Sequence, residues 1–363
     1  MRILVGMPEQ GSRGGPAACE PPFIEELRRL GHQVEAEVYA YAESESGLSH
    51  RINRVMRTAR LFQQRVHESR FDLVHINTSF DTKALLRDAV IIPRLHSSGA
   101  KIFLKFHGSD ANLLQTSNPA LALARRRLLA HADGIGVLSS EEQANFLRAG
   151  IAEEKVFVIK NVVESNPQSP SPLFRKQMNL PEDVPLLLFI GRFIPAKGLL
   201  DVIRACGLLR DRGQQFMLLA IGDGSARQDA ENEVAQLNLS GQVRFLGYIP
   251  EAETPGYYIN SDLLVFPTYH YEGFPMVIFN AAAAGLPIIT TRIRAAADYL
   301  KEPDNCLWVG PGSPEFLAGR IQDLLGDAEL RAAMSGKNKK LAAEFSAAAV
   351  TEEYVKAYEQ IAK

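Results

Sequence analysis

The sequence has few cysteines and no long apolar run, and each absence narrows what the protein can be. Three cysteines, Cys19, Cys206 and Cys306, lie far apart in the 363 residues and form no CxxC pair. This spacing argues against a zinc site or a disulfide framework and fits a reducing compartment. No stretch approaches the roughly 20 apolar residues of a membrane span, and the run after Met1 is too short for a signal-peptide core. We therefore expect a cytoplasmic protein.

The chain also lacks an excess of either positive or negative charge. Lys and Arg number 40 against 42 Asp and Glu, so the formal net charge is -2. Because nothing in this balance favours a polyanion, we expect no nucleic-acid partner. A hydrophobic content of 46% with 23% charged residues is typical of a globular protein. A chain of this length exceeds what one hydrophobic core usually organises, which predicts two domains.

Strand-like apolar runs alternate with helical patterns in two successive series. This alternation predicts two α/β domains of the Rossmann-like kind, each with a parallel sheet between helices. A proline-rich segment without periodicity, 164–174, separates the series. We expect an N-terminal domain at 1–166, a C-terminal domain at 167–345 and a last helix at 346–363 that crosses back to the first domain. Parallel sheets bind ligands beyond the carboxyl ends of their strands, so the active site is expected in a cleft between the domains.

Two cations stand at a strand-to-helix junction in FIGRFIPAKGLLDVI (189–203). Arg192 and Lys197 follow a strand that ends at Ile190, and a helix begins near Gly198. Cations beside the free amides of a helix N-terminus are suited to a diphosphate. The alternative is that both are solvated surface charges, as most Lys and Arg side chains are.

A carboxylate stands at a similar junction in PTYHYEGFPMVIFNAAAAGLPIITT (267–291). Glu272 follows a strand, and a helix starts near Pro275, where proline is favoured because its missing N–H costs nothing. A carboxylate here can accept hydrogen bonds from sugar hydroxyls. Alternatively, Glu272 only interacts with the positive end of the helix.

Four segments, FIGRFIPAKG, AIGDGSA, VRFLGYIP and the stretch from Glu272 to Thr291, have the order and spacing found in glycosyltransferase family 4. The chain resembles this family over nearly the whole C-terminal domain and, more weakly, over the N-terminal one. The family consists of retaining enzymes with the GT-B fold, two Rossmann-like domains facing a central cleft. The resemblance implies transfer of a hexose-type sugar from a nucleotide-diphosphate sugar to a hydroxyl of a glycan or lipid-linked glycan, with no cofactor besides this donor substrate.

The resemblance also assigns roles to residues of the C-terminal domain. Arg192 and Lys197 match the pair that neutralises the donor diphosphate, and Glu272 is expected beside the hydroxyls of the donor sugar. Together with His107, these residues are the catalytic candidates. The remaining donor-binding candidates of this domain are Gly191, Gly222, Gly224, Tyr248, Ile249, Gly273, Phe274, Pro275, Met276, Val277 and Asn280.

Asn280 departs from the family's pattern, which has a second glutamate eight positions after the first, on the ribose hydroxyls. A carboxylate accepts both hydroxyl hydrogens in charge-assisted bonds, whereas an amide offers one acceptor and one donor group. We expect donor binding to be weaker by about 1–2 kcal/mol, and Asn280→Glu to strengthen it. The departure leaves open an unusual donor, or a non-catalytic binding or scaffold protein of the same fold. A sugar-nucleotide epimerase of this fold is a further alternative.

The N-terminal domain adds a glycine loop and a histidine. Gly14 and Gly15 follow the first strand, where the family has a loop that approaches the phosphate or acceptor, although a plain surface turn fits them equally. His107 lies in LKFHGSD, and the family has a His-Gly-x-Asp segment here, near the donor sugar. Asp110 is an acceptor-side candidate, or a cap of the next turn.

The N-terminal domain also contains two basic stretches, 51–70 and Arg125 to Arg127. Family members with lipid-linked acceptors often dock basic helices of this domain on anionic membranes, which implies peripheral contact at the inner face of the cell membrane. The alternative is a surface helix with solvated arginines, on which Ile52, Phe62 and Val66 share one face.

For the reaction, the resemblance implies front-face attack, in which the acceptor hydroxyl approaches the anomeric carbon on the side from which the nucleotide leaves. Arg192 and Lys197 would stabilise the negative charge that grows on the diphosphate. No carboxylate cluster with metal-ligand spacing is evident, and two fixed cations make a divalent ion dispensable. We expect no metal.

Overall fold

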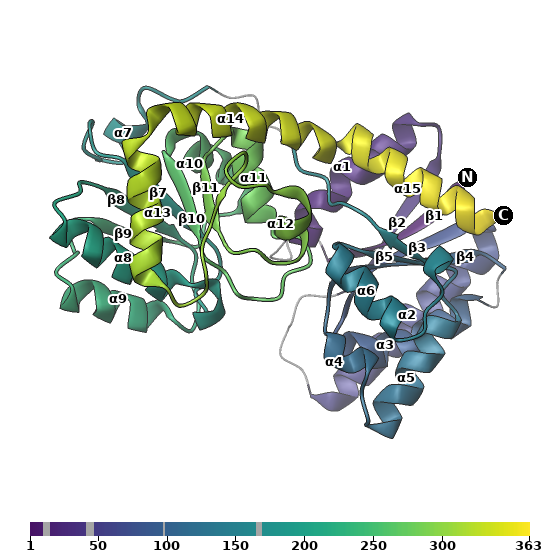
Figure 1. Ribbon diagram of the computed structural model, residues 1–363. Coiled ribbons are helices and arrows are strands. Elements are labelled where there is room, and N and C mark those ends of the chain that lie inside the picture. The colour runs from purple at the N-terminus through teal and green to yellow at the C-terminus, as the bar shows by residue number, and fades with distance from the viewer. Residues whose placement is uncertain (10–14, 41–46, 97–98, 165–168) are drawn as a thin grey trace. The chain divides into compact units, whose positions relative to one another are not determined.

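The computed structural model describes the whole chain except residues 10–14, 41–46, 97–98 and 165–168. The chain divides into two units, drawn in Figure 1. Unit 1 comprises Met1–Val162, Glu272–Phe274 and Ala347–Lys363, and unit 2 comprises Val163–Tyr271 and Pro275–Ser346. The expected domain boundary between 166 and 167 lies outside the described residues.

Unit 1 is built on a six-stranded parallel sheet with the order β2-β1-β3-β4-β5-β6. Its strands are β1 (Arg2–Pro8), β2 (Gln33–Ala40), β3 (Leu73–Phe80), β4 (Lys101–Ser109), β5 (Gly134–Val137) and β6 (Val156–Val158). The strand order reverses between β1 and β3. In open parallel sheets, such a reversal is where ligands bind, at the carboxyl ends of the strands.

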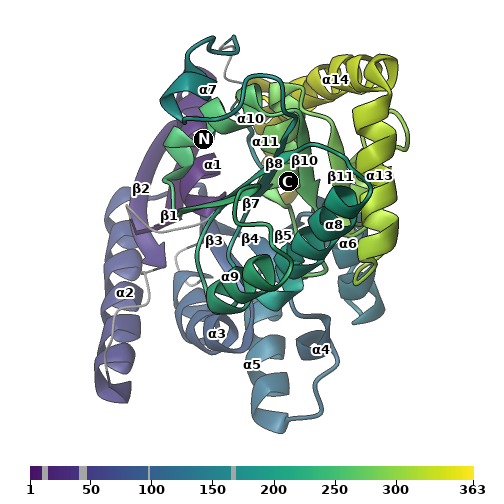
Figure 2. The same cartoon turned by 90° about the vertical axis from the view of Figure 1, so that its left-hand side faces the viewer.

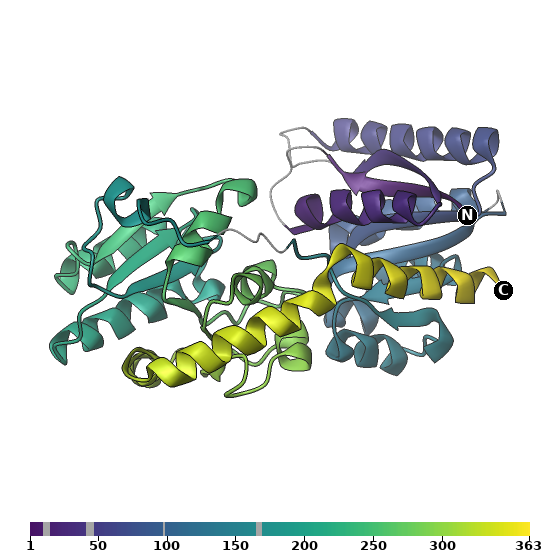
Figure 3. The same cartoon turned by 90° about the horizontal axis from the view of Figure 1, so that it is seen from above.

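Helices cover both faces of this sheet. They are α1 (Gly15–Arg29), α2 (Leu48–Ser69), α3 (Thr82–His96), α4 (Ala111–Leu114), α5 (Pro119–Ala130), α6 (Ser140–Arg148) and α15 (Ala347–Ala362). Helix α3 packs against α2 and α5, while α1 packs against α15, the last helix of the chain. Figure 3 shows α1 and the yellow α15 on the opposite side of the sheet from α2.

The apolar stripe of α15 explains its place in unit 1. Val350, Tyr354, Ala357, Tyr358 and Ile361 recur at helical spacing, and all are buried. Because these side chains cover the same sheet as α1, the C-terminal residues complete the core of the N-terminal unit.

The apolar face of α2 is buried only in part. Ile52 is 53% exposed, whereas Phe62 and Val66 in the later part of the helix are buried. At the start of α6, the Ser139 hydroxyl accepts a hydrogen bond from the Glu142 amide and caps the helix.

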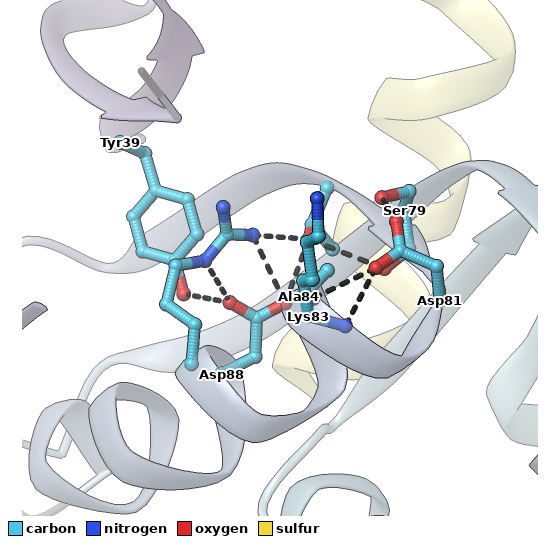
Figure 4. Close-up of polar contacts among 8 residues, drawn as sticks. Tyr39, Ser79, Asp81, Lys83, Ala84 and Asp88 are labelled. Carbon is cyan, nitrogen blue, oxygen red and sulfur yellow. Dashed lines mark hydrogen bonds and ion pairs between the residues drawn. The ribbon is translucent and has the colours of Figure 1, made fainter. Parts of the chain in front are cut away.

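A buried carboxylate joins the sheet to α3 (Figure 4). Asp88 accepts hydrogen bonds from the Tyr39 hydroxyl at 2.7 Å and from the Thr78 hydroxyl at 2.6 Å, and it pairs with Arg87 at 2.7 Å. At the start of α3, Asp81 accepts from the Ala84 amide at 2.9 Å. These bonds satisfy the buried charge and fix α3 against β2 and β3.

Unit 2 is also built on a six-stranded parallel sheet, with the order β12-β11-β10-β7-β8-β9. Its strands are β7 (Leu186–Ile190), β8 (Met217–Ile221), β9 (Val243–Gly247), β10 (Leu263–Phe266), β11 (Ile288–Thr290) and β12 (Leu307–Trp308). The central strands β7, β8 and β10 are buried throughout, as expected for parallel strands covered on both faces. This order is that of the Rossmann fold, and it reverses between β7 and β10.

The helices of unit 2 again lie on two faces. They are α7 (Phe174–Gln177), α8 (Leu199–Asp211), α9 (Arg227–Gln236), α10 (Pro255–Asn260), α11 (Met276–Ala284), α12 (Arg294–Tyr299), α13 (Pro314–Gly326) and α14 (Ala328–Ala342). Helix α8 packs against α9 and α13, and α11 packs against α10 and α14 (Figure 2). The prediction of two Rossmann-like α/β domains is confirmed, while the cleft between them stays a prediction. In the described parts of the chain, no helix is both long and apolar enough to span a bilayer.

Candidate functional site

Two loops at the carboxyl edge of the unit 2 sheet approach each other so closely that their contact positions require glycine. The loop after β7 begins with Gly191, and the loop after β8 begins with Gly222. A Cβ on Gly222 would lie 1.9 Å from the carbonyl oxygen of Gly191, and one on Gly224 would lie 2.6 Å from that of Phe193. Both glycines also have positive φ, so other residues would be strained as well as crowded. The three glycines predicted at this site therefore lie at one edge.

Lys197 is almost fully buried at this edge. It is the last residue of the 3-10 turn η2 (Pro195–Lys197), and 3% of its surface is exposed. Its Nζ lies 5.3 Å from the centre of the Phe266 ring. Burial and the neighbouring Arg192, which is itself exposed, lower the pKa of the Lys197 ammonium group to about 7. An anion placed beside these two cations would relieve both the desolvation and the repulsion.

Two further basic side chains, which the sequence analysis did not single out, join this pair. Burial lowers the pKa of His270, and Lys197, Arg192 and Arg294 lower it further. Arg294 is 4% exposed, and its Nη1 donates to the carbonyl oxygen of Tyr271 at 3.3 Å. We call Arg192, Lys197, His270 and Arg294 the basic cluster.

The basic cluster comes from three loops that follow adjacent strands, β7, β10 and β11. The Tyr269 amide donates to the Ala196 carbonyl at 2.9 Å, which ties the loop after β10 to the loop after β7. The Thr291 hydroxyl donates to the Thr268 carbonyl, which ties in the loop after β11. Arg294 has a φ of 38°, in the left-handed region that costs a non-glycine residue about 1–3 kcal/mol. Its position just after a strand was the one signal that could have found it.

Glu272 lies in a short loop segment that groups with the other unit. Glu272, Gly273 and Phe274 group with unit 1, whereas the flanking Tyr271 and Pro275 belong to unit 2. Pro275 is the N-cap residue of α11. The position of the Glu272 carboxylate beside a donor sugar therefore stays a prediction.

The segment after β9 carries the predicted base site. Tyr248 is 49% exposed, whereas Ile249 packs against the hydrophobic core of the unit. Two residues further on, Glu251 is half-buried, and burial raises the pKa of its carboxyl group. A carboxylate thus lies close in sequence to the expected base.

Helix α11 places Asn280, which departs from the family's pattern, beside the Glu251 carboxylate. Met276 and Val277 form its first turn, with Asn280 one turn further on. The side-chain amide of Asn280 donates to Oε1 of Glu251 at 3.4 Å. Glu251 was not singled out from the sequence, because nothing local relates residue 251 to residue 280.

In unit 1, His107 belongs to a buried polar network at the carboxyl ends of β3 and β4. The network comprises Glu20, His75, Asn77, Lys105 and His107. Nζ of Lys105 lies 2.7 Å from Oε1 of Glu20, and Asn77 donates to the other carboxylate oxygen at 2.9 Å. Burial alone would raise the pKa of Glu20, but Lys105 and the two imidazoles outweigh it and lower this pKa to about 2. Glu20 is therefore ionised at neutral pH.

The network also fixes the tautomer of His107. The Asn77 amide nitrogen faces two acceptors, Glu20 and the Gly6 carbonyl at 3.2 Å, so its Oδ1 must face His107. Nε2 of His107 lies 2.9 Å from this oxygen and therefore donates to it. Burial and Lys105 hold the pKa of His107 well below its usual value, so the ring is neutral. Its Nδ1 is then an acceptor, and it is buried without a hydrogen-bond partner among the described residues.

The remaining candidates in unit 1 have local roles or lie outside the described residues. Asp110 is exposed and caps α4 by accepting from the Asn112 amide at 2.9 Å, which was one of the two roles expected for it. Gly14 lies outside the described residues, and Gly15 is the first residue of α1. Over the described parts of both units, no group of three or more His, Cys, Asp or Glu side chains could hold a metal ion.

Two protein-family models match the chain. The model described as "Glycosyl transferases group 1" matches residues 171–341, which contain the basic cluster and Asn280. The model described as "Glycosyl transferase 4-like domain" matches residues 14–162, which contain the buried polar network. Together the two matches leave residues 1–13, 163–170 and 342–363 unmatched.

Curated relatives are similar over parts of the chain. A 2-deoxystreptamine glucosyltransferase of Streptomyces kanamyceticus is 30% identical over 59% of this chain and 58% of its own length. A D-inositol 3-phosphate glycosyltransferase of Corynebacterium glutamicum is 27% identical over 77% of this chain and 70% of its own. For the first relatives, the matched region spans about half of their length.

Solved structures are similar over nearly the whole chain. Anabaena Alr3699/HepE in complex with UDP has a TM-score of 0.78 at 20% identity, over 98% of this chain and 99% of that one. Sucrose-phosphate synthase from Thermosynechococcus elongatus has a TM-score of 0.79 at 20% identity, over 99% of both chains. At this identity the likeness establishes a shared fold.

Proposed function

The chain belongs to the glycosyl transferases group 1 family, and on this premise we propose that it is a retaining glycosyltransferase. The proposed reaction moves a hexose-type sugar from a nucleotide-diphosphate sugar to a hydroxyl of a glycan or lipid-linked glycan. The observation that carries the proposal is the basic cluster in unit 2, with a lysine whose pKa is lowered to about 7 by burial and by Arg192. Relatives named as glycosyltransferases support the activity, and solved structures of the same fold are described with UDP.

The donor diphosphate is proposed to bind the basic cluster. Arg192 and Lys197 hold the two phosphates, as the family resemblance implies, and Arg294 adds a third fixed positive charge. Charge-assisted bonds to phosphate oxygens are roughly twice as strong as neutral ones, and strongest where water is excluded. The nucleobase lies against Tyr248 and Ile249, and the sugar against the segment from Glu272 to Val277.

Transfer is proposed to follow the front-face course. The bond from the anomeric carbon to the phosphate oxygen breaks, and a bond to the acceptor oxygen forms on the same side. The acceptor's proton passes to the departing phosphate oxygen, so no protein base is required. Negative charge grows on the diphosphate during this step, where Lys197 and Arg192 stabilise it. Three fixed cations supply the charge that a divalent ion would otherwise bring, so we propose that activity survives a chelator.

His107 is proposed to orient the donor sugar. Its Nδ1 lone pair is buried and faces no donor among the described residues, so a sugar hydroxyl can donate to it. The neutral ring is suited to this role, because a protonated imidazole would repel the developing positive charge on the sugar. Asn77 and Glu20 act as positioning residues that keep the acceptor nitrogen on the ligand side.

The acceptor is proposed to bind unit 1, with peripheral membrane contact where the acceptor is lipid-linked. Helix α2 supports this contact, because Ile52 and Leu61 are 53% and 37% exposed on a helix that also carries Arg57 and Arg60. Sedimentation with vesicles containing anionic lipid tests it. Ile52→Ser with Leu61→Ser should release the protein, and equal sedimentation with neutral vesicles would contradict the proposal.

Charge-removing variants of unit 2 test the function. A thermal-shift panel of uridine, guanosine, adenosine and thymidine diphosphate sugars first identifies the donor. Arg192→Ala and Lys197→Met should then lower transfer at least about 100-fold, the scale of losing one transition-state contact. Arg204→Ala is the matched control, because Arg204 is an exposed arginine of α8 paired with Glu233 at 2.9 Å.

Three results would count against the proposal. Near-normal turnover in Arg192→Ala or Lys197→Met would remove the assigned roles. An epimerised sugar nucleotide formed from donor alone would indicate an epimerase. The absence of any nucleotide binding would indicate a binding or scaffold protein.

A further inference from the structure

Glu251 and Asn280 form a polar pair, and neither the family resemblance nor the proposed reaction assigns a role to Glu251. Glu251 opens the 3-10 turn η3 (Glu251–Glu253) after β9, and Asn280 lies in the second turn of α11. Their side chains meet across 29 residues of sequence, with Nδ2 of Asn280 donating to Oε1 of Glu251 at 3.4 Å. Both side chains are half-buried and therefore also face solvent-accessible space.

The Glu251 carboxylate is poorly satisfied by this one contact. Burial raises its pKa, and the hydrogen bond from Asn280 lowers it only in part. A carboxylate has two oxygens with about four lone-pair sites, and the amide contact occupies one of them at a long distance. No ion pair of Glu251 occurs among the described residues. A carboxylate that is partly desolvated and short of donors is a ready acceptor for ligand hydroxyls.

The position of the pair identifies those hydroxyls. Glu251 is two residues beyond Ile249, where the base is proposed to lie. Asn280 is one turn beyond Met276, in the segment against which the donor sugar is proposed to lie. In a nucleoside diphosphate, the sugar that joins base to phosphate is ribose, with two vicinal hydroxyls. The only groups of that unit able to donate hydrogen bonds are these hydroxyls, and the pair offers two oxygen acceptors.

The family resemblance places position 280 at the ribose hydroxyls of the donor nucleotide, and we infer that Glu251 joins Asn280 in this ribose subsite and supplies its charged acceptor. The carboxylate of Glu251 accepts a hydrogen bond from one ribose hydroxyl, and Oδ1 of Asn280 accepts one from the other. The Asn280 side chain is held in place by Glu251 and by a hydrogen bond with the buried Tyr258 side chain. The charged acceptor missing at position 280 is thus supplied by another element of the same unit. This inference rests on the proposed donor site.

The pair also changes what Asn280→Glu should do. Without Glu251, a glutamate at 280 would add a charged acceptor and strengthen donor binding. Beside Glu251 it brings two half-buried carboxylates together, and like charges at this distance raise the pKa of one or both. We therefore expect the single variant to bind the nucleotide no tighter than wild type, and the double variant Glu251→Gln/Asn280→Glu to restore one carboxylate with an amide donor beside it.

Calorimetry with ribose and deoxyribose nucleotides tests the inference. The probes are UDP, GDP and ADP, each with its 2′-deoxy form, titrated into the full-length protein. Wild type should prefer the ribose form of the nucleotide that it binds by about tenfold, the scale of one hydrogen bond to a charged group. Glu251→Gln should reduce the preference to about twofold or less, and Asn280→Ala should also reduce it. The double variant should recover it.

The matched control is Glu253→Gln, on an exposed glutamate of the same η3 turn. It should leave both affinities and the preference unchanged, and thermal melting should show that all variants fold. A wild-type protein that binds ribose and deoxyribose forms equally, or a Glu251→Gln variant that keeps the preference, overturns the inference and leaves the donor site intact. A wild-type protein that binds none of the nucleotides overturns the proposed function and this inference with it.

Discussion

Donor binding should be linked to protonation of Lys197. The pKa of its ammonium group is lowered to about 7 because the side chain is buried and Arg192 lies nearby. In the ligand-free protein at pH 8, about nine molecules in ten therefore carry a neutral lysine at this position. A bound diphosphate places negative charge beside the amine and raises its pKa again. Binding at pH 8 must therefore take up a proton.

The magnitude follows from the size of the shift. At pH 8 the uptake should be about 0.9 proton per donor bound, and at pH 6 about 0.1. Since the cationic form prevails below pH 7, affinity is full there and falls as the pH rises through 7. The protonation cost at pH 8 is about 1.4 kcal/mol, equivalent to about tenfold weaker binding than at pH 6. His270 titrates below its usual value of 6.5 and so changes little between pH 7 and 9.

Calorimetry in two buffers of different ionisation enthalpy measures this uptake directly. The ligand is the best-bound nucleotide sugar of the thermal-shift panel, because its diphosphate diester does not titrate in this range. Lys197→Arg keeps the positive charge without the titration, so it should bind with no uptake at pH 8. Tight wild-type binding without proton uptake, or uptake that persists in Lys197→Arg, would refute the reasoning.

Three further predictions concern stability, each measured by urea denaturation. Gly222→Ala should lower the free energy of unfolding by at least about 3 kcal/mol, because the new Cβ would meet the Gly191 carbonyl at a positive φ. The control Gly241→Ala, with open space around it, should change this free energy by no more than about 0.5 kcal/mol. Arg294→Gly should be about 1 kcal/mol more stable than Arg294→Ala, because only glycine is unstrained at a φ of 38°; an equal or more stable alanine variant would contradict this. Burial lowers the pKa of His75 to about 4 from an ordinary 6.5, so only the unfolded chain takes up a proton between these values, and stability should fall by about 2–3 kcal/mol from pH 7 to pH 4.5. His75→Gln should lose less over the same range.

The sequence alone determined the architecture of both units. Parallel strands covered on both faces must be apolar throughout, so runs such as Leu186 to Ile190 can be recognised as strands from the sequence. The stripe from Val350 to Ile361 likewise predicted a helix with one buried face. These signals are local, because each depends on the spacing of neighbouring residues. The loop with Arg192 and Lys197 was found for the same reason.

Only the tertiary structure decided which distant residues share a site. Strand order places the loops after β7, β10 and β11 side by side, and this brings His270 and Arg294 to the predicted cations. The same folding sets Glu251 against Asn280, so the residue that departs from the family's pattern has a carboxylate partner 29 positions away. Burial, which no local pattern reports, moves the pKa of Lys197 to about 7. The sequence could name the loops of the site, whereas their contacts and charges depend on how the sheet is ordered and what it buries.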